Sequence, residues 1–378
     1  MSLNRVEEAA RDVAEGKIVV LIDEASGSHE GALMMAAEKV TPQAVNFMAA
    51  QARGLVCLPM TAQRLDQLRI PLMAPKNRAA HATAFCVSIE ARRDVTTGIS
   101  AADRATTILT AIDPNRGPDD VVMPGHVFPQ RARPGGVLER AGKTEAAVDL
   151  SRIAECLPAA VICQMLNADG TLAGLDEVNE FAQREGLKTV SISDLITFRL
   201  ATERFVERVA SMPFQGELGS FQVHLYENRL DRRRHLAFVK GRIEADQPTL
   251  VRVHTESVLS DVFLNNRSSA GRDLRGAMSR IEEEGCGVLV YLSPQDRDEA
   301  LAEEFEHDSR PDPAGRRHPR GTFREYGVGA QILADLGLRK VRLLTNHPKN
   351  IVALQGFDLQ IEDQIPIRNP LPATPDDD

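Results

Sequence analysis

The sequence predicts a mixed protein of the α+β class, built from two domains with different layouts. Helix and strand patterns alternate from residue 4 to about residue 193. From Phe214 onward, three strand candidates follow one another closely, and helical patterns come after them. A chain of 378 residues is long enough for two domains that each bury a core of their own.

The first domain begins with an amphipathic helix over residues 4–15. Asn4 followed by Glu7 resembles a capping box, and Gly16 is a typical stop signal. The other elements expected in this domain are helices that start at Thr41 with Pro42, at Ser100 and at Thr144, strands over 17–22, 55–58, 161–164 and 188–192, and a charge-rich helix over 194–210.

The second domain is expected to place its strands first. Its expected elements are strands over 221–226, 235–240 and 249–254, then helices over 271–284, over 325–336 and after Pro348. The stretch 307–320 is polar, carries three prolines and shows no periodicity, which predicts a loop.

Charge and composition are those of an ordinary enzyme. The 45 basic and 54 acidic residues give a net charge of -9, which argues against a nucleic-acid partner held by phosphate neutralisation. No apolar run is long enough to cross a bilayer, and the N-terminus lacks a signal-peptide pattern, so we expect a cytoplasmic protein without a membrane partner. The five cysteines are scattered and odd in number, which predicts buried free thiols.

Five segments carry a resemblance to one family. They are TTGISAADR (96–104), PGHVFP (124–129), TEAAVDL (144–150), VRVHTE (251–256) and VRLLTN (341–346). In this order they resemble bifunctional riboflavin-biosynthesis proteins, in which a 3,4-dihydroxy-2-butanone 4-phosphate synthase is fused to a GTP cyclohydrolase II. The resemblance implies a synthase-like α/β domain over 1–205, a cyclohydrolase-like mixed α/β domain over 210–370 and a disordered tail over 371–378.

The first acidic loop departs from this family. The family places a metal-binding Glu, a phosphate-contacting Arg and a later Asp here, since a hard divalent cation prefers oxygen ligands. In the present segment, DEASGSHEGALMM, these three positions align with Ser28, Gly27 and Ala32. A flexible turn over residues 26–28 is the alternative interpretation.

Two further positions of the synthase chemistry also differ. The metal-binding His of the family aligns with Lys143, and an ammonium cannot coordinate a cation without losing its proton. The catalytic Glu aligns with Gln164, which cannot accept a proton at neutral pH. We therefore expect no metal in this domain. Lys143 is either a solvated lysine or a replacement for the positive charge of the cation.

The rest of the pocket keeps the family's residues. We name Lys143, His126 and Glu30 as candidate catalytic residues, with His126 expected in a Pro/Gly-rich loop. The candidate substrate-binding residues are Thr97, Asp103, Arg104, Arg140, Thr144 and Glu145. Several of these have simpler structural interpretations, because Asp103 can pair at a helix start and Thr144 can serve as an N-cap.

The second domain has lost the residues of a zinc site. The family binds zinc through three cysteines, which here align with Ser257, Ser268 and Ala270. We expect no stoichiometric zinc and no GTP hydrolysis above background. The candidate anion-binding residues that remain are Arg252, Arg297, Arg324 and Lys349, although solvated arginines are the simpler interpretation of each.

Three hypotheses about function stay open. The first is a divergent enzyme that has lost both standard activities and acts without metal or cofactor on a small oxygenated or phosphorylated substrate, such as a sugar phosphate, in the first domain. The second is a non-catalytic paralogue that binds or regulates in the riboflavin pathway. The third is a genuine synthase with an inactive cyclohydrolase domain. In each case the resemblance implies a homodimer.

Overall fold

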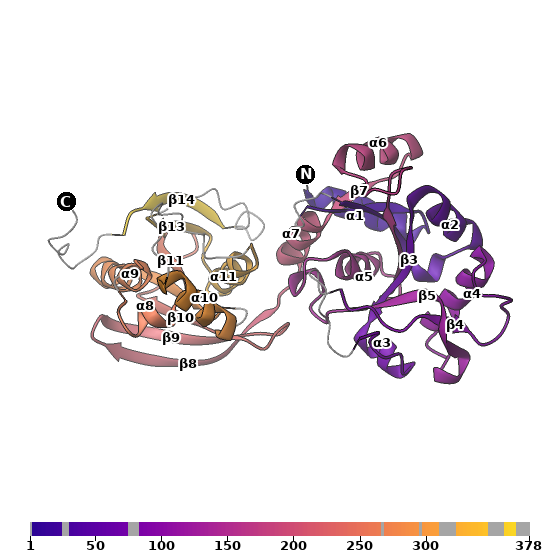
Figure 1. Cartoon of the computed structure of the whole chain (residues 1–378). Helices are drawn as coiled ribbons and strands as arrows, with labels where there is room; N and C mark the ends of the chain where they lie inside the picture. The colour runs from indigo at the N-terminus through magenta and orange to yellow at the C-terminus, as the bar shows by residue number, and fades with distance from the viewer. Residues whose placement is uncertain are drawn as a thin grey trace. The chain divides into compact units, whose positions relative to one another are not determined.

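The protein divides into two compact units. The structure, a computed structural model, describes residues 2–24, 30–74, 83–265, 268–294, 297–309, 323–346 and 359–367. Unit 1 is Met1–Arg199 and unit 2 is Leu200–Asp378, and each contains a seven-stranded sheet with helices packed on it (Figure 1). The predicted mixed two-domain class is confirmed.

Unit 1 alternates helices and strands, as its sequence predicts. Its helices are α1 (Ser2–Ala14), α2 (Pro42–Phe47), α3 (Ala62–Gln67), α4 (Ala101–Ile112), α5 (Lys143–Ile153), α6 (Leu175–Glu185) and α7 (Ile192–Thr202). Its strands are β1 (Val19–Asp23), β2 (Glu30–Ala36), β3 (Arg53–Thr61), β4 (Ile89–Ala91), β5 (Val121–Ala132), β6 (Ala160–Met165) and β7 (Thr189–Ser191). The strand order β4-β5-β3-β6-β2-β1-β7 makes a mixed sheet, in which β3 runs parallel to β5 and antiparallel to β6.

The two faces of this sheet are covered by different helices. Leu33 and Met35 of β2 join a buried cluster with Val45 of α2 and Ile108 of α4. Because side chains alternate along a strand, Glu30 and the other even-numbered residues of β2 lie on the opposite face. That face is the one on which α5 packs, and Figure 1 shows α5 and α2 on opposite sides of β3.

Two local expectations for unit 1 are wrong. PGHVFP is not a loop, because it lies within β5. Residues 123–126 bulge out of the irregular pairing with β4. A proline is tolerated in such a bulge, because a complete set of ladder hydrogen bonds is not needed there. Thr144 is not an N-cap, because α5 starts one residue earlier with Gly142 as its N-cap, and the Thr144 hydroxyl donates instead to Gln130 Oε1 at 2.7 Å.

Unit 2 starts with a run of strands, as expected. Its strands are β8 (Val206–Gly216), β9 (Gly219–Asn228), β10 (Arg234–Lys240), β11 (Thr249–Thr255), β12 (Gly287–Leu292), β13 (Lys340–Leu344) and β14 (Gln360–Ile365). Its helices are α8 (Val258–Asp261), α9 (Ala270–Glu284), α10 (Arg297–Ser309) and α11 (Phe323–Asp335). The sheet order is β14-β13-β11-β12-β10-β9-β8, with parallel pairing among β11 to β14 and antiparallel pairing elsewhere.

The core of unit 2 lies between this sheet and α9. Leu250 and Leu289 point toward α9 and pack with Ile281, and Phe238 adds an edge-on contact with Phe214 at 5.6 Å between ring centroids. On the other face, α11 approaches β11 and β12 closely at Gly329. Burial of these apolar faces stabilises the unit.

The predicted boundary helix over 194–210 is wrong in its second half. α7 ends at Thr202, and β8 begins at Val206 and pairs along β9 down to Gly216. This pairing outweighs the local charge pattern that favoured a longer helix. The helix expected after Pro348 falls mostly outside the described residues, and the described part, β14, is a strand. The tail over 371–378 also lies outside them.

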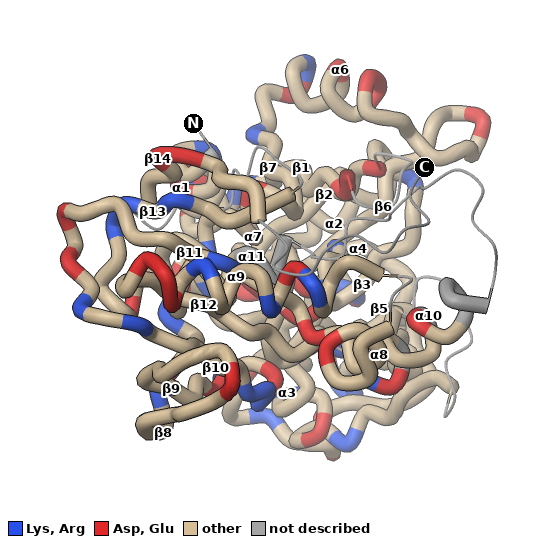
Figure 2. Tube along the Cα trace, turned by 90° about the vertical axis from the view of Figure 1, so that its left-hand side faces the viewer, with Lys and Arg blue, Asp and Glu red and all other residues tan. Residues whose placement is uncertain are grey.

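Acidic and basic residues are interspersed along single elements, for example α6 and α9 (Figure 2). Within the described residues, no helix is long and apolar enough to cross a membrane. Three of the five cysteines, at positions 57, 86 and 163, are buried free thiols as expected, and the other two are half-buried.

Candidate functional site

A compact charged cluster lies on the α5 face of the unit 1 sheet. The Lys143 ammonium donates a hydrogen bond to Glu30 Oε2 at 2.7 Å and lies 3.7 Å from Asp23 Oδ2. The side-chain amide of Gln164 donates to the same Glu30 oxygen at 3.2 Å. The structure therefore brings together two candidate catalytic residues, Lys143 and Glu30, with Gln164, which aligns with the family's catalytic Glu, and with Asp23.

The strand register explains this convergence. Asp23 at the end of β1 pairs directly with Glu30 at the start of β2, and Gln164 of β6 pairs with Ala32 of β2. Alternation along the strands puts all three polar side chains on the face that α5 covers. Lys143 is the first residue of α5, so the helix start carries the ammonium to them.

Lys143 is not a solvated surface lysine. Its side chain is 18% exposed, and those of Asp23 and Glu30 are 12% and 16% exposed. The described residues contain no group of three or more His, Cys, Asp or Glu side chains placed to hold a metal ion. The divalent cation that the family implies does not fit here, because an ammonium already contacts both carboxylates. Ser28 lies outside the described residues, and Ala32 is buried in β2.

The start of α5 is held by a second ion pair. Arg140 donates to Glu145 Oε2 at 2.6 Å and also contacts Thr83, and Glu145 accepts a hydrogen bond from the backbone of Arg133. Burial raises the pKa of Glu145, although Arg140 opposes this shift. Arg140, Thr144 and Glu145 are thus neighbours with partners inside the protein.

The TTGISAADR segment folds around one buried carboxylate. Asp103 accepts hydrogen bonds from the Thr96 hydroxyl at 2.7 Å and from the Gly98 backbone at 3.0 Å. The hydrogen bond from Thr96 holds the pKa of Asp103 below its ordinary value. Thr97 is exposed. Arg104 Nε is buried and has no hydrogen-bond partner among the described residues.

His126 belongs to a separate contact. Its Nδ1 lies 3.3 Å from Glu90 Oε2, and its ring is about half exposed. A Cβ atom at Gly98 would lie 1.0 Å from Glu90 Oε1, so Gly98 leaves room for this carboxylate. Glu90 was missed in the sequence because no motif marks it, and only the pairing of β4 with β5 brings it to His126.

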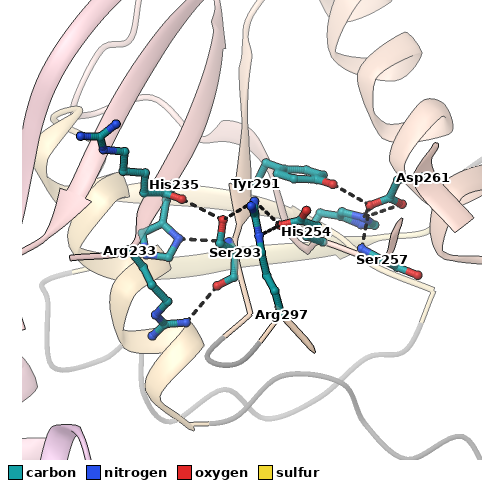
Figure 3. Close-up of polar contacts among 10 residues, drawn as sticks. Arg233, His235, His254, Ser257, Asp261, Tyr291, Ser293 and Arg297 are labelled. Atoms are coloured by element: carbon teal, nitrogen blue, oxygen red, sulfur yellow. Dashed lines mark hydrogen bonds and ion pairs between the residues drawn. The ribbon is translucent and has the colours of Figure 1, made fainter. Parts of the chain in front are cut away.

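In unit 2, a hydrogen-bonded network occupies the segment where the family has its first zinc ligand. His254 Nε2 lies 3.0 Å from both carboxylate oxygens of Asp261, and the Tyr291 hydroxyl donates to Asp261 Oδ2 at 2.9 Å. The backbone N–H of Ser257 donates to the same oxygen at 2.9 Å (Figure 3). No sequence motif marks this network, which forms where β11 ends near His254 and the short helix α8 follows.

This network does not suit zinc. Ser257 is buried and engages Asp261 through its backbone, and the Ser268 hydroxyl accepts a hydrogen bond from the Ala270 backbone at 3.2 Å. Neutral hydroxyls are poor zinc ligands. The chemistry of the residues therefore disagrees with the metal that the family implies for this domain.

Two of the four residues of the predicted anion-binding surface of unit 2 are described with their side chains, and each has a partner within the protein. Arg252 donates to the Leu344 carbonyl at 3.1 Å, and Arg297 pairs with Glu256 at 2.9 Å. The Arg324 side chain and the whole of Lys349 lie outside the described part of the chain, so an anion site that includes them stays a prediction.

Both halves of the chain match known families. A model of the 3,4-dihydroxy-2-butanone 4-phosphate synthase family matches residues 7–198. A model of the GTP cyclohydrolase II family matches residues 207–366. The two matched ranges fall within the two compact units, in the order that the sequence motifs indicate.

Individual relatives match over almost the full length. Riboflavin biosynthesis protein RibBA of Aquifex aeolicus is 46% identical over 375 residues, which cover 97% of this chain and 92% of that protein. A 3,4-dihydroxy-2-butanone 4-phosphate synthase of Pseudomonas aeruginosa is 45% identical over 97% of this chain and 100% of its own. The crystal structure of RibBX, a two-domain 3,4-dihydroxy-2-butanone 4-phosphate synthase from A. baumannii, is similar with a TM-score of 0.78 and 39% identity, covering 95% of this chain and 99% of that one.

Proposed function

Because the chain belongs to the family of bifunctional riboflavin-biosynthesis proteins, with a 3,4-dihydroxy-2-butanone 4-phosphate synthase domain followed by a GTP cyclohydrolase II domain, we propose that it is a synthase of this pathway whose unit 1 carries the chemistry. Unit 2 is proposed to have no cyclohydrolase activity. The buried cluster of Lys143, Glu30 and Asp23 is the observation that carries this proposal.

The comparisons favour this function over the divergent enzyme that we first expected. Relatives that are 45–46% identical to this chain bear the names of riboflavin-biosynthesis proteins. These names do not support a paralogue that has lost both activities. Two relatives that cover nearly the whole chain, one from Pseudomonas aeruginosa and one from A. baumannii, are named for the synthase alone. These names support a synthase in unit 1 and leave unit 2 another role.

The charges in the unit 1 cluster suit the start of the synthase reaction. The family resemblance implies ribulose 5-phosphate as the substrate. This compound is an α-hydroxyketone, and its rearrangement requires a proton to leave carbon while negative charge develops on oxygen. Glu30 is proposed to accept the proton, and the Lys143 ammonium beside it to stabilise the developing oxyanion. Arg104, with its buried and unbonded Nε, is the proposed contact for the phosphate.

The remaining assignments stay predictions. Thr97, Asp103, Arg140, Thr144 and Glu145 are proposed to line the same substrate site, and His126 to act from β5. A sugar phosphate as the ligand, a homodimer and a cytoplasmic location belong to the same proposal.

A turnover assay on the purified full-length chain tests this function. Ribulose 5-phosphate is expected to yield formate and 3,4-dihydroxy-2-butanone 4-phosphate in equal amounts, while GTP consumption stays at background and elemental analysis finds far less than one zinc per chain. If no formate appears above a protein-free control, the synthase assignment is wrong and a non-catalytic paralogue is the better interpretation. Stoichiometric zinc together with GTP hydrolysis would overturn the assignment of unit 2.

A further inference from the structure

Two carboxylates face each other directly in the unit 1 pocket. Asp23 and Glu30 are register partners on neighbouring antiparallel strands, and both side chains lie on the α5 face. Like charges placed opposite each other on a sheet destabilise it, and the effect grows when the side chains are largely withdrawn from water, as these are. A positive charge beside both carboxylates offsets this repulsion, and the Lys143 ammonium contacts both of them.

Lys143 supplies that charge from an unfavourable position. It is the first residue of α5, where the helix dipole disfavours a cation. Its ammonium is nevertheless directed at the two carboxylates, 2.7 Å from Glu30 and 3.7 Å from Asp23. The carboxylates, rather than the helix, thus fix its position. An ammonium has three donors, and the described residues accept one hydrogen bond from it, so it can also donate to a ligand oxygen.

Gln164 completes a cluster that has no place for a second cation. Its amide donates to the Glu30 oxygen that Lys143 also contacts. Gln164 is neutral, whereas a carboxylate at this position would add a negative charge and help to attract a divalent ion. Any divalent ion entering between Asp23 and Glu30 would also have to displace a like-charged ammonium. The Lys143 ammonium therefore occupies the position between the carboxylates that the divalent metal implied by the family would need.

We propose that Lys143 is a built-in cation that replaces the divalent metal in the unit 1 pocket, so that this pocket receives the carbonyl or hydroxyl oxygen of its ligand without any metal ion. The ammonium and the ligand oxygen form a hydrogen bond, and no covalent step is required. The identity of the ligand as a ketose phosphate rests on the proposed function, but the exclusion of the metal does not.

Binding of Mn²⁺, followed by electron paramagnetic resonance, tests the exclusion directly. The wild-type chain is expected to leave added Mn²⁺ free, whereas Lys143→Met, which removes the ammonium from both carboxylates, should bind it at least about 10-fold more tightly. The double variant Lys143→Met with Glu30→Gln should lose this binding again. The double variant also removes the repulsion between Asp23 and Glu30 that the loss of Lys143 leaves unbalanced, so it can still be measured if the single variant folds poorly.

Lys17→Met is the matched control. Lys17 also contacts two carboxylates, Asp12 at 3.0 Å and Glu15 at 2.7 Å, but its side chain is 58% exposed. Removing it should create no Mn²⁺ site, because these carboxylates are solvated. Stoichiometric binding of Mn²⁺ by the wild-type chain would overturn the proposal, as would equal binding by the wild-type and Lys143→Met chains.

A second measurement uses ribulose 5-phosphate as the probe. The thermal stabilisation that it gives to the wild-type chain should be equal in EDTA and in Mg²⁺, should disappear in Lys143→Met and should be partly restored in Lys143→Arg. Loss of the stabilisation in EDTA would contradict the built-in cation. If ribulose 5-phosphate stabilises no variant under any condition, the proposed function fails, and the Mn²⁺ result still decides whether Lys143 replaces the metal.

Discussion

His235 is a buried histidine held in its neutral form by its surroundings. Its Nδ1 accepts a hydrogen bond from the backbone of Ser293 at 3.1 Å, so Nε2 carries the hydrogen, and that atom is buried without a partner among the described residues. Figure 3 shows Arg233 and Ser293 beside the ring. Burial, reinforced by the Arg233 charge, lowers the pKa of His235 to about 4.

The depressed pKa of His235 predicts a loss of stability in acid. The unfolded chain protonates this side chain below about pH 6.5, whereas the folded chain resists protonation down to about pH 4, so stability present above pH 6.5 falls as the pH decreases to 4. The loss from this residue is at most about 3 kcal/mol. His235→Asn keeps a hydrogen-bond acceptor but cannot titrate. The difference in its free energy of urea unfolding between pH 7 and pH 4.5 should therefore be smaller than that of the wild-type chain. An unchanged difference would contradict the assignment.

At the scale of single elements, α4 shows how a local signal fixes a helix start. Ser100 adopts an extended conformation, and its hydroxyl accepts a hydrogen bond from the Asp103 backbone at 3.0 Å. The same turn holds the Asp103 carboxylate, whose partners Thr96 and Gly98 lie in the preceding segment. The cap therefore sets the position of a candidate substrate-binding residue as well as the helix.

Ser100→Ala should destabilise the chain by about 1 kcal/mol, because one backbone N–H at the helix start loses its acceptor. The measurement is the free energy of unfolding in urea, and the slope of this free energy against urea concentration is expected to stay the same. Ser100→Asp, which keeps an oxygen acceptor and suits the positive end of the helix dipole, should stay close to the wild-type value. If the alanine and aspartate variants are equally stable, the cap does not contribute.

At the scale of the whole molecule, each unit has a core of its own. The larger cluster of unit 1 is built on residues such as Leu33 and Ile108, and the cluster of unit 2 on residues such as Leu250 and Ile281. Units of this size are large enough to fold independently.

A fragment of residues 1–203, which ends after α7, is therefore expected to fold without unit 2. Its far-ultraviolet circular dichroism should show mixed helix and strand, and its urea unfolding should be a single cooperative transition. The full-length chain provides the reference for both measurements. A fragment that lacks a cooperative transition would mean that unit 1 depends on unit 2 for its stability.

The sequence by itself determined the class of the protein, the order of most elements and the family. These follow from signals that lie close together in the chain, such as the periodicity of 4–15, the cap at Ser100 and the motifs that flank each domain. It also identified Lys143 and Glu30 separately, as a changed metal ligand and a remaining acidic residue.

Only the tertiary structure decided that these two residues meet. They are 113 positions apart, and their contact depends on the register of β1 with β2 and on the packing of α5 over the same sheet face. The contact of His126 with Glu90 likewise depends on the pairing of β5 with β4, and the end of α7 at Thr202 is followed by the pairing of β8 with β9. Such pairing is decided by which apolar faces can be buried together, and local sequence carries little information about that choice.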